Sequence, residues 1–363
     1  MEVSTVPNNS LINDIRTQPE FKSITFSRYK KTEVKNQFIE NMLKGKIEPA
    51  CYWCAEFVCA GHYAEIWEDI IFYLGKHIHI GNPKLAIYLE KRYTIFKNIL
   101  EKGHFVSELE LRNNSTIRRL FAEVICVLTL SAKHNSFETV KIKREDEFDI
   151  TQIADKLKAD SITFVGPIFR PRDPKELLIP INEFAYHIGS DKKNMLSACY
   201  WIEWIIEFDL ICRKTKQPVY CERRMNNVEN KSQCDIIWLI WDVLVYYVKQ
   251  RKNPFIENIM NSLLNIFCIK YTTASCKRRK YLLYFAVEIM TNHVPTNIEL
   301  FQNKEVIYSV VEKIDQIYAQ IKKNEDSPNT DYLFSNLDSK QNLESSIKKM
   351  ELLSTIDLAS QEL

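Results

Sequence analysis

Glycine and proline are scarce in this sequence, with 7 glycines and 12 prolines among 363 residues. Proteins rich in β-structure need both residues at their many turns, so this scarcity favours a helical architecture. The sequence also lacks any run of about 18 apolar residues, the length that a membrane-spanning helix requires, so no membrane partner is expected. Its 49 basic and 47 acidic residues nearly cancel, which excludes a general electrostatic attraction to nucleic acid.

The motifs that mark common enzyme classes are missing as well. The sequence contains no glycine-rich phosphate-binding motif, no zinc-protease motif and no serine-hydrolase elbow. Residues 1–20 include no apolar segment of the kind found in a secretory signal. We therefore expect an intracellular protein, cytoplasmic or nuclear, whose ten cysteines are reduced, and we predict no catalytic residue and no cofactor.

The sequence does contain a repeat, because the four residues ACYW occur at 50–53 and again at 198–201. Tryptophan, cysteine and tyrosine are rare residues, so chance is a poor explanation for the recurrence. Further matches follow in the same order, namely Ile66 with Ile240, Asn82 with Asn253, Ile95 with Ile266, and Phe121 with Phe285. This shared order predicts that a module of four helices is duplicated within the chain.

Hydrophobic periodicity predicts an all-α fold, a two-lobed helical body with a small irregular insert between the copies. The predicted parts are a disordered N-terminal tail (1–25), a first helical module (26–135), an insert (136–190), a second helical module (191–323) and a linker with a C-terminal tail (324–363). Residues 161–165 have strand-like composition, so one or two short strands are expected in the insert. The expected helices are 32–43, 49–60, 64–79, 83–100, 116–132, 193–211, 234–250, 254–271 and 277–290, with one or two closing helices within 297–322 and a tail helix over 343–358.

Three cysteines and a histidine near the first ACYW have a spacing that could suit zinc, namely Cys51, Cys54, Cys59 and His62. In a continuous helix, however, Cys59 points away from the other three residues, and the second copy has Ile202 in the place of Cys54. We therefore interpret the cysteines as buried thiols of a helix, with a metal site as the weaker alternative.

His77 and His79 stand near the end of an expected helix and could look like a catalytic or metal-binding pair. Because they are two residues apart, they point to different sides of a helix, and we interpret them as cations near a helix C-terminus. Cys212, Cys221 and Cys234 in the second copy show no paired spacing, so a metal site there is also a weaker alternative.

Basic residues cluster near the start of the fourth helix in both copies and in a polar insertion of the second copy. The full set is Arg118, Arg119, Arg213, Lys214, Arg223, Arg224, Lys277, Arg278, Arg279 and Lys280. Clusters of this kind neutralise phosphates in nucleic-acid-binding proteins. Convergence of these side chains on one face would support nucleic-acid binding, whereas scattered positions would argue against it.

Two long segments resemble an uncharacterised all-helical family of nucleocytoplasmic large DNA viruses. They read ACYW…IWED…GNPKLAIYLEKRY and ACYWIEWIIEF…DIIWLIWDVL, and the similarity covers about residues 47–332. The resemblance implies a viral protein that is made in an infected host cell and that could enter the virion. It transfers no active-site residue to this chain.

The preferred hypothesis is a non-enzymatic helical scaffold or adaptor that acts through protein–protein contacts in viral assembly or replication. Such an adaptor needs an exposed apolar or aromatic groove and no pocket in which titratable groups converge. The first alternative is a nucleic-acid-associated accessory factor of replication or transcription that uses the basic clusters. The second is an enzyme of unrecognised type, which would bring His62 or His77 together with a thiol and an acid in a cleft.

Overall fold

The fold is all-α, as the sequence predicted. The structure, a computed structural model, describes residues 6–103, 107–142, 148, 153–189, 191–224 and 227–326. These residues form twelve α-helices joined by short 3-10 turns and one π turn, and they include no β-strand. Within the same ranges, β pairing is limited to isolated bridges between Ile24 and Lys30 and between Tyr220 and Asp235.

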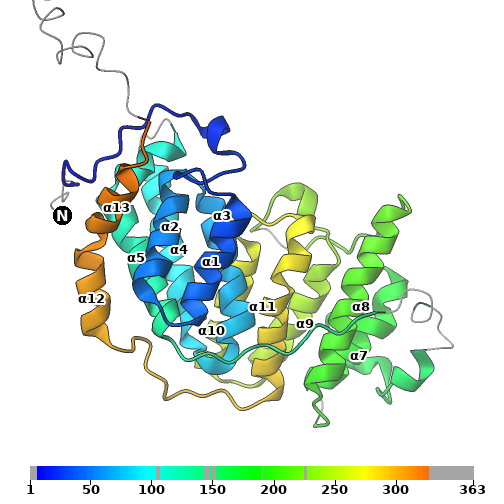
Figure 1. Cartoon of the computed structure of the whole chain (residues 1–363). Coiled ribbons are helices and arrows are strands. Elements are labelled where there is room, and N and C mark those ends of the chain that lie inside the picture. Colours follow the sequence, from blue (N-terminus) through cyan, green and yellow to red (C-terminus); the bar gives the residue numbers. More distant parts are fainter. Residues whose placement is uncertain are drawn as a thin grey trace, which may run out of the picture.

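The first lobe lies at the blue-to-cyan end of the chain (Figure 1). It consists of α1 (Lys31–Leu43), α2 (Ile47–Cys59), α3 (Tyr63–Tyr73), α4 (Lys84–Lys102) and α5 (Ser115–Leu130). Helix α2 packs between α1 and α5, because it is apolar nearly all round. Helix α5 begins where the sequence predicted, since the side chain of Asn114 accepts hydrogen bonds from the N–H groups of Thr116 and Ile117.

The second lobe has helices in the same order and with corresponding packing partners. It consists of α7 (Leu178–Gly189), α8 (Met195–Lys214), α9 (Ile237–Gln250), α10 (Pro254–Cys268) and α11 (Thr273–Thr291). Helix α8 packs between α7 and α11, as α2 packs between α1 and α5, and α4 packs directly against α10. These parallels fit an internal duplication, which stays a prediction, and they assign α1 and α7 to corresponding places outside the predicted four-helix module.

Helix α3 ends earlier than predicted. The expected helix reached residue 79, but the chain leaves the α-helix after Tyr73 and continues as a π turn, Leu74–Ile78, and a 3-10 turn, His79–Gly81. The turn passes very close to α11, because a Cβ atom built on Gly75 would lie 3.0 Å from the backbone nitrogen of Leu282. The change from α-helix to π turn therefore occurs where the chain packs against α11. Local periodicity carries no information about this distant contact.

The strands predicted in the insert are absent from its described residues. Residues 161–165 instead contain a 3-10 turn, Ile162–Phe164, because the side chain of Ser161 accepts a hydrogen bond from the N–H of Thr163. The side chain of Asn182 donates to the carbonyl of Ser161, so local polar bonds replace a strand ladder. The end of the insert forms α7, which tolerates Pro180 because this residue lies in the first turn.

The prediction of a disordered tail over residues 1–25 is wrong for residues 6–25. Ile12 and Phe21 are buried, and residues Gln18–Phe21 form a 3-10 turn. This aperiodic segment is ordered by tertiary packing rather than by its own helical propensity. Residues 1–5 lie outside the described residues, as does the tail helix predicted over 343–358.

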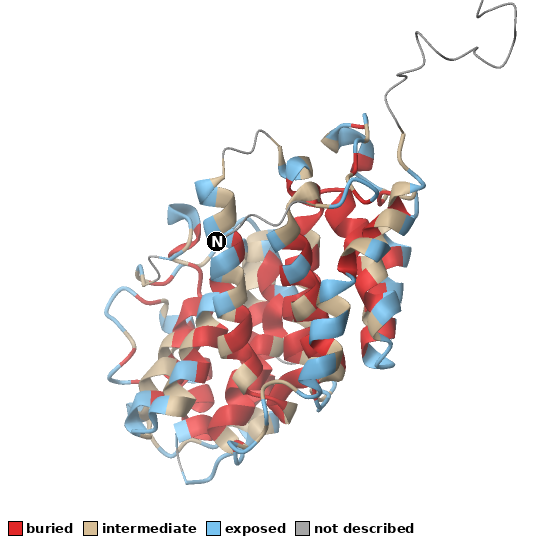
Figure 2. Ribbon diagram, turned by 90° about the vertical axis from the view of Figure 1, so that its left-hand side faces the viewer, coloured by how far each residue is buried: buried red, intermediate tan, exposed pale blue. Residues whose placement is uncertain are grey.

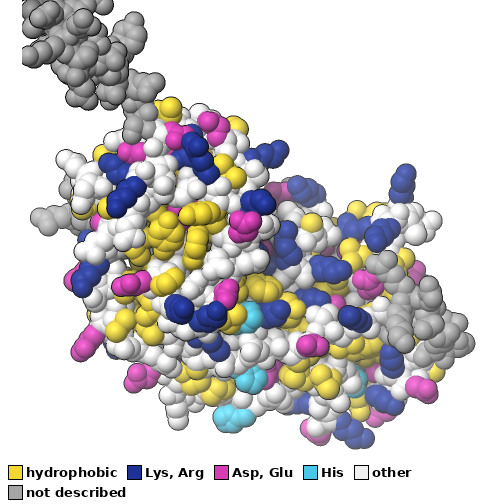
Figure 3. Space-filling model, in the orientation of Figure 1, with side chains coloured by type: hydrophobic (Ala, Val, Ile, Leu, Met, Phe, Trp, Pro, Cys, Tyr) yellow, Lys and Arg dark blue, Asp and Glu magenta, His cyan; other side chains and the backbone are white. Residues whose placement is uncertain are grey.

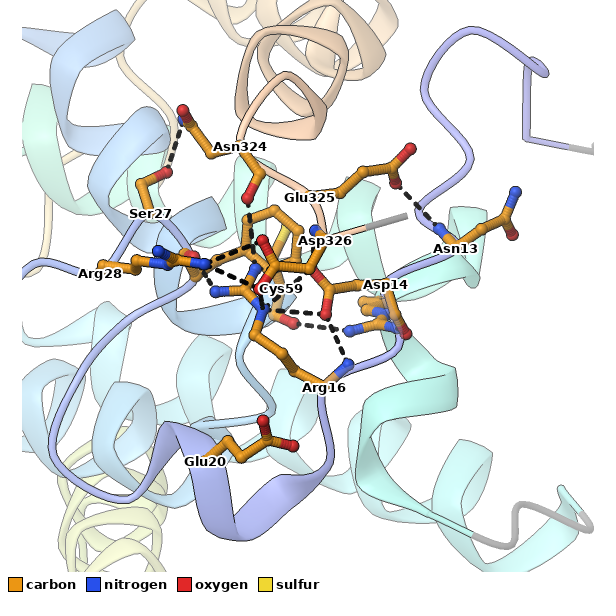
Figure 4. A network of polar contacts seen from close by, with 12 residues as sticks. Asn13, Asp14, Arg16, Glu20, Ser27, Arg28, Cys59, Asn324, Glu325 and Asp326 are labelled. Atoms are coloured by element: carbon orange, nitrogen blue, oxygen red, sulfur yellow. Dashed lines mark hydrogen bonds and ion pairs between the residues drawn. The ribbon is translucent and has the colours of Figure 1, made fainter. Parts of the chain in front are cut away.

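A polar network fastens this N-terminal segment to the residues that follow the last helix (Figure 4). Arg16 donates to the side chain of Asp14 at 2.9 Å and to the carbonyl of Phe26 at 2.9 Å. Asp14 in turn accepts a hydrogen bond of 2.9 Å from the backbone N–H of Asp326, and Arg28 pairs with the Asp326 carboxylate at 2.8 Å. Residues more than 300 positions apart in the chain are thereby held together.

Two closing helices cover the first lobe rather than the second. Helix α12 (Lys304–Glu312) packs on α5, and α13 (Ile314–Lys322) packs on α2, at the orange end of the chain in Figure 1. Buried residues run along the inner faces of the helices in both lobes (Figure 2). Throughout the part of the chain that is described, no helix combines the length and apolar character that crossing a bilayer requires.

Candidate functional site

The basic set predicted to bind nucleic acid is divided between the interior and the surface. Arg118, Arg279 and Lys280 are buried, and only 1% of the Arg224 side chain is exposed. Arg118 pairs with Asp315 at 2.7 Å and lies 4.0 Å from the ring centre of Tyr318. Its partners belong to α13, so Arg118 fastens a closing helix to α5.

The other buried cations also hold parts of the fold together. Arg279 on α11 forms an ion pair with Glu68 on α3 and donates to the carbonyl of Phe267, so it links the two lobes. Lys280 pairs with Glu203 at 3.0 Å. Charged groups that are desolvated need such partners, and these cations are therefore unavailable to phosphates.

Arg213 is half-buried and pairs with Asp209 and Asp235, at 2.8 Å and 2.9 Å. Arg224 pairs with Asp173 and with Asp242. The cations that remain exposed are Arg119, Lys214, Arg223, Lys277 and Arg278. These five cations are half of the predicted set. They are distributed over α5, the end of α8, a connecting segment and α11.

The four residues considered as a weaker zinc alternative do not converge on one point in the described chain. Cys51, Cys54, Cys59 and His62 are all buried, but no three of them belong to a group of converging metal-ligand atoms in the described chain. A hydrogen bond with Cys126, together with burial, raises the pKa of the Cys51 thiol, and burial raises the pKa of the Cys54 thiol. The interpretation as buried thiols agrees with this arrangement, and all ten cysteines are free.

Each histidine proposed for an enzyme has one ring nitrogen within hydrogen-bond distance of an oxygen of the fold. The ring nitrogen Nε2 of His62 lies 2.9 Å from the carbonyl oxygen of Ile24. Nδ1 of His77 lies 2.9 Å from the side-chain oxygen of Asn135. Burial lowers the pKa of both imidazoles, so both are neutral side chains in structural hydrogen bonds at pH 7.

A cavity of about 500 Å³ lies where the lobes meet, and we call it the junction cavity. Its walls come from α1, α3 and α4 of the first lobe and from residues 269–279 of the second. Aromatic side chains form much of its lining, with Trp67, Tyr93 and Phe96 in mutual ring contact. The lobe-linking pair of Arg279 with Glu68 also lines it.

Titratable groups converge at the junction cavity. Asp69 lies in its wall with 2% of its side chain exposed, and burial raises the pKa of this carboxyl to about 6 despite an ion pair with Lys35. Lys35 is 49% exposed, so water screens its attraction for the carboxylate. The adaptor hypothesis required that no pocket of this kind exist, so the junction cavity counts against that hypothesis and favours a small-molecule site.

Two residues of the lining, Tyr63 and Trp67, carry a hydroxyl and an indole N–H without a hydrogen-bond partner in the described residues. Both polar groups are themselves buried and do not face the cavity, so they define no contact for a ligand.

A second hollow of about 480 Å³ lies between α2 and the closing helices, and we call it the aromatic groove. Tyr52 and Trp53 of the first ACYW form one wall, and both are half-buried. Tyr29, 44% exposed, meets Trp53 edge-to-face with ring centres 5.6 Å apart. Hydrophobic side chains gather over α2 and α1 on this face of the molecule (Figure 3).

A third group, which sequence reasoning missed, consists of His79, His134 and Glu288. Their potential metal-ligand atoms all lie within 4.8 Å of one another. The sequence interpretation treated His79 as a helix-end cation and gave His134 and Glu288 no role. No spacing rule could have found the group, because its members come from three distant segments of the chain.

A comparison with protein-family models, with curated proteins and with solved structures found no match. The resemblance to a viral family therefore stays a prediction. The fold and the hollows described above are the basis for a functional proposal.

Proposed function

We propose that this chain is a non-enzymatic helical adaptor that holds an amphipathic helix of a protein partner in the aromatic groove. The observation that carries the proposal is Trp53, which remains partly exposed although the matching Trp201 of the second ACYW is 0% exposed. An aromatic side chain that the fold leaves partly exposed is available as an anchor for a partner. Tryptophan and tyrosine are the residues most enriched among the energetic hot spots of protein interfaces.

The shape and charge of the groove indicate the chemistry of the partner. Its walls are α2 on one side and α12 with α13 on the other, so a third helix can lie between them. The charged residues lining it, Glu48 and Lys313, have opposite signs, and Gln316 and Gln320 are neutral. We therefore expect a helix with an apolar stripe and few charges facing the groove.

The test is a selection of displayed random peptides on the purified full-length chain, followed by affinity measurements on the enriched peptides. We expect apolar and aromatic residues at helical spacing in these peptides. Trp53→Ala should weaken their binding about tenfold or more, as truncation of a hot-spot residue does. Tyr308→Ala is the matched control, because Tyr308 is 67% exposed on α12 and does not line the groove.

Two results would overturn the adaptor proposal. One is a set of peptides whose affinities are the same for the Trp53→Ala variant and the original chain. The other is binding of labelled DNA or RNA that falls steeply with salt and is lost when Lys277 and Arg278 are both replaced by alanine. That second result would favour the alternative of a nucleic-acid-associated accessory factor.

The junction cavity supports a second candidate function, the binding of a small molecule, on which an enzyme of unrecognised type could act. The specific observation is that Asp69, whose pKa is raised to about 6, lies in the same cavity wall as the aromatic side chains of Trp67 and Tyr93. Perturbed carboxyl groups in apolar cavities are frequent at ligand and catalytic sites.

This candidate can be tested by a thermal-shift screen of small aromatic compounds, which suit the aromatic lining of the cavity. Compounds that bind in the cavity should lose their effect in Leu100→Trp, because Leu100 lines the cavity and the larger side chain fills it. They should keep it in Ile95→Trp, on the same helix, because Ile95 is 39% exposed and outside the cavity. Equal loss in both variants would exclude the cavity as the binding site.

A further inference from the structure

The turn that follows α3 has an unusual backbone. It comprises the π turn Leu74–Ile78 and the 3-10 turn His79–Gly81, and His79 has a φ angle of 48°. Such a positive φ is unfavourable for a residue with a side chain, and it persists only where the surroundings hold it in place. Single π turns are also frequent at functional sites. The backbone here is therefore held in a conformation that local sequence alone would not favour.

The segment after α5 holds this turn in place. The backbone N–H of His134 donates to the carbonyl of His77 at 3.0 Å, and that of Ser136 donates to the carbonyl of Lys76 at 2.8 Å. A Cβ atom on Gly81 would lie 2.8 Å from the carbonyl oxygen of Ala132, so only glycine fits this contact. Histidine side chains appear at the lower middle of the face in Figure 3, beneath α1 and α11.

Helix α11 of the second lobe supplies the third side of the arrangement. A carboxylate oxygen of Glu288 contacts Nδ1 of His79, and the other accepts a hydrogen bond from the side chain of Asn292 at 3.3 Å. The His79 ring stacks on Phe285 with ring centres 4.9 Å apart. His79 and Glu288 are buried, whereas His134 is exposed.

We propose that His79, His134 and Glu288 bind a divalent transition-metal ion of the zinc class. Two imidazoles and one carboxylate are a ligand set that zinc and related ions use, and three protein ligands leave a further position for water. In the part of the chain that is described, this is the one group of three or more such residues whose ligand atoms converge, within 4.8 Å of one another.

A second, independent observation points to a ligand at this place. His79 is 0% exposed, yet its Nε2 atom has no hydrogen-bond partner in the described chain. A buried imidazole nitrogen without a partner loses its hydration and gains nothing in return, unless a proton donor or a metal ion fills the position. Exposed His134 would give an ion access from solvent.

A metal ion at this site would connect three separate parts of the chain. His79 follows α3, His134 follows α5, and Glu288 lies on α11. The first two belong to the first lobe and the third to the second lobe, so the ion would fasten the lobes to each other. Binding would then raise the melting temperature of the whole chain, because metal affinity adds to the stability of the folded state.

The test uses the full-length chain, freed of metal with a chelator and titrated with Co²⁺ and then with Zn²⁺. We expect one Co²⁺ per chain, with the visible absorption of a low-coordinate cobalt site, displacement by Zn²⁺, and a higher melting temperature with Zn²⁺. Replacing the exposed ligand by His134→Ala should weaken binding about tenfold or more. His293→Ala is the matched control, since His293 is an exposed histidine just after α11 that does not belong to the group.

Glu288→Gln provides a further variant, because glutamine keeps the size of the side chain and removes its charge. We expect weaker Co²⁺ binding in this variant, with an unchanged helical circular dichroism spectrum. The proposal is overturned if no visible cobalt absorption develops. It is equally overturned if His134→Ala binds as tightly as the original chain, or if His293→Ala removes binding to the same extent, which would indicate adventitious binding by surface histidines.

Discussion

The same four residues, ACYW, lie in α2 of the first lobe and in α8 of the second, but their surroundings differ. Cys51 and Cys199 are both buried, at 2% and 0% exposed. Trp201 is also completely buried, whereas Trp53 lines the aromatic groove. The identical local sequence therefore gives both helices the same buried inner face. The two helices differ in the chain segments that pack on their outer faces.

The parts of the chain that cover the two helices also differ. On α8, the insert contributes Lys156, whose ammonium lies 4.1 Å from the ring centre of Tyr200, and Phe148, whose ring packs on Trp204 at 4.9 Å. On α2, the covering is α13, which leaves the groove open beside Trp53. Two helices with the same four residues are therefore exposed to different extents, because different non-repeated segments lie beside them.

The largest expected effect is a loss of stability on substitution of Trp201, which can be compared directly with the same substitution at Trp53. Trp201→Ala should lower the free energy of unfolding by about 3 to 5 kcal/mol, because it leaves a cavity in the core. Trp53→Ala should lower it by about 1 to 2 kcal/mol, since part of this side chain is already exposed to solvent. Urea unfolding of the three proteins measures both values. Equal losses would show that Trp53 is a core residue and would remove the basis of the aromatic groove as a docking surface.

A smaller loss of stability is expected on substitution of Asp14, which belongs to the polar network between the N-terminal segment and the residues after α13. Burial by itself would raise the pKa of Asp14, but hydrogen bonds from Arg16 and from the backbone of Asp326 hold it below its ordinary value. An acid with a lowered pKa in the folded state stabilises the fold above its unfolded pKa, and this contribution is lost as the pH falls through the folded pKa. Asp14→Asn should therefore cost about 2 kcal/mol at pH 7 and progressively less below about pH 4.

Urea unfolding of the Asp14→Asn variant across this pH range provides the measurement. Asp326→Asn is the control, because the Asp326 side chain is 36% exposed and should contribute less. A cost at Asp14 that did not vary with pH would mean that the network depends on shape rather than on the charge of this carboxylate.

The smallest predicted effect concerns Asp69. Here the substitution is expected to raise the free energy of unfolding, whereas the substitutions above lower it. This residue follows Trp67 by two positions, where the second copy has Val243 after Trp241, so the first lobe has a carboxyl where the second has an apolar core residue. Burial raises the pKa of Asp69 to about 6, so the folded state holds its proton more tightly than the unfolded state does. Stability contributed by this group is therefore lost as the pH rises through about 6.

Asp69→Asn should accordingly raise the free energy of unfolding by about 1 kcal/mol at pH 8 and leave it nearly unchanged near pH 4.5. Chemical unfolding at the two pH values measures this difference. A variant that is less stable at pH 8 would show that the ion pair with Lys35 outweighs the burial of the charge.

Several features of the fold were predictable because they depend on local sequence. Helix α10 begins at Pro254 after Asn253, whose side chain accepts hydrogen bonds from the first turn, as the asparagine–proline pair indicated. The cationic run 277–280 shows the limit of such reasoning. Successive residues of a helix point about 100° apart, so a run of four covers every side of α11. Two of its members, Arg279 and Lys280, are consequently buried, while Lys277 and Arg278 are exposed.

Other features depended on contacts that no local pattern records. The N-terminal segment has no helical periodicity, but Arg16 and Asp14 meet Asp326 from the opposite end of the described chain. The candidate metal residues, likewise, are brought together from beyond α3, beyond α5 and within α11.

The sequence by itself determined the all-α class, most helix positions and the inner faces of the helices, because periodicity and capping act over a few neighbouring residues. Only the tertiary structure decided that Trp53 is partly exposed while Trp201 is buried, that half of the ten predicted nucleic-acid-binding cations form internal ion pairs, and that His79 meets His134 and Glu288. The physical reason is that burial and charge pairing depend on which distant segments pack together. Local sequence patterns do not show which distant segments will come into contact.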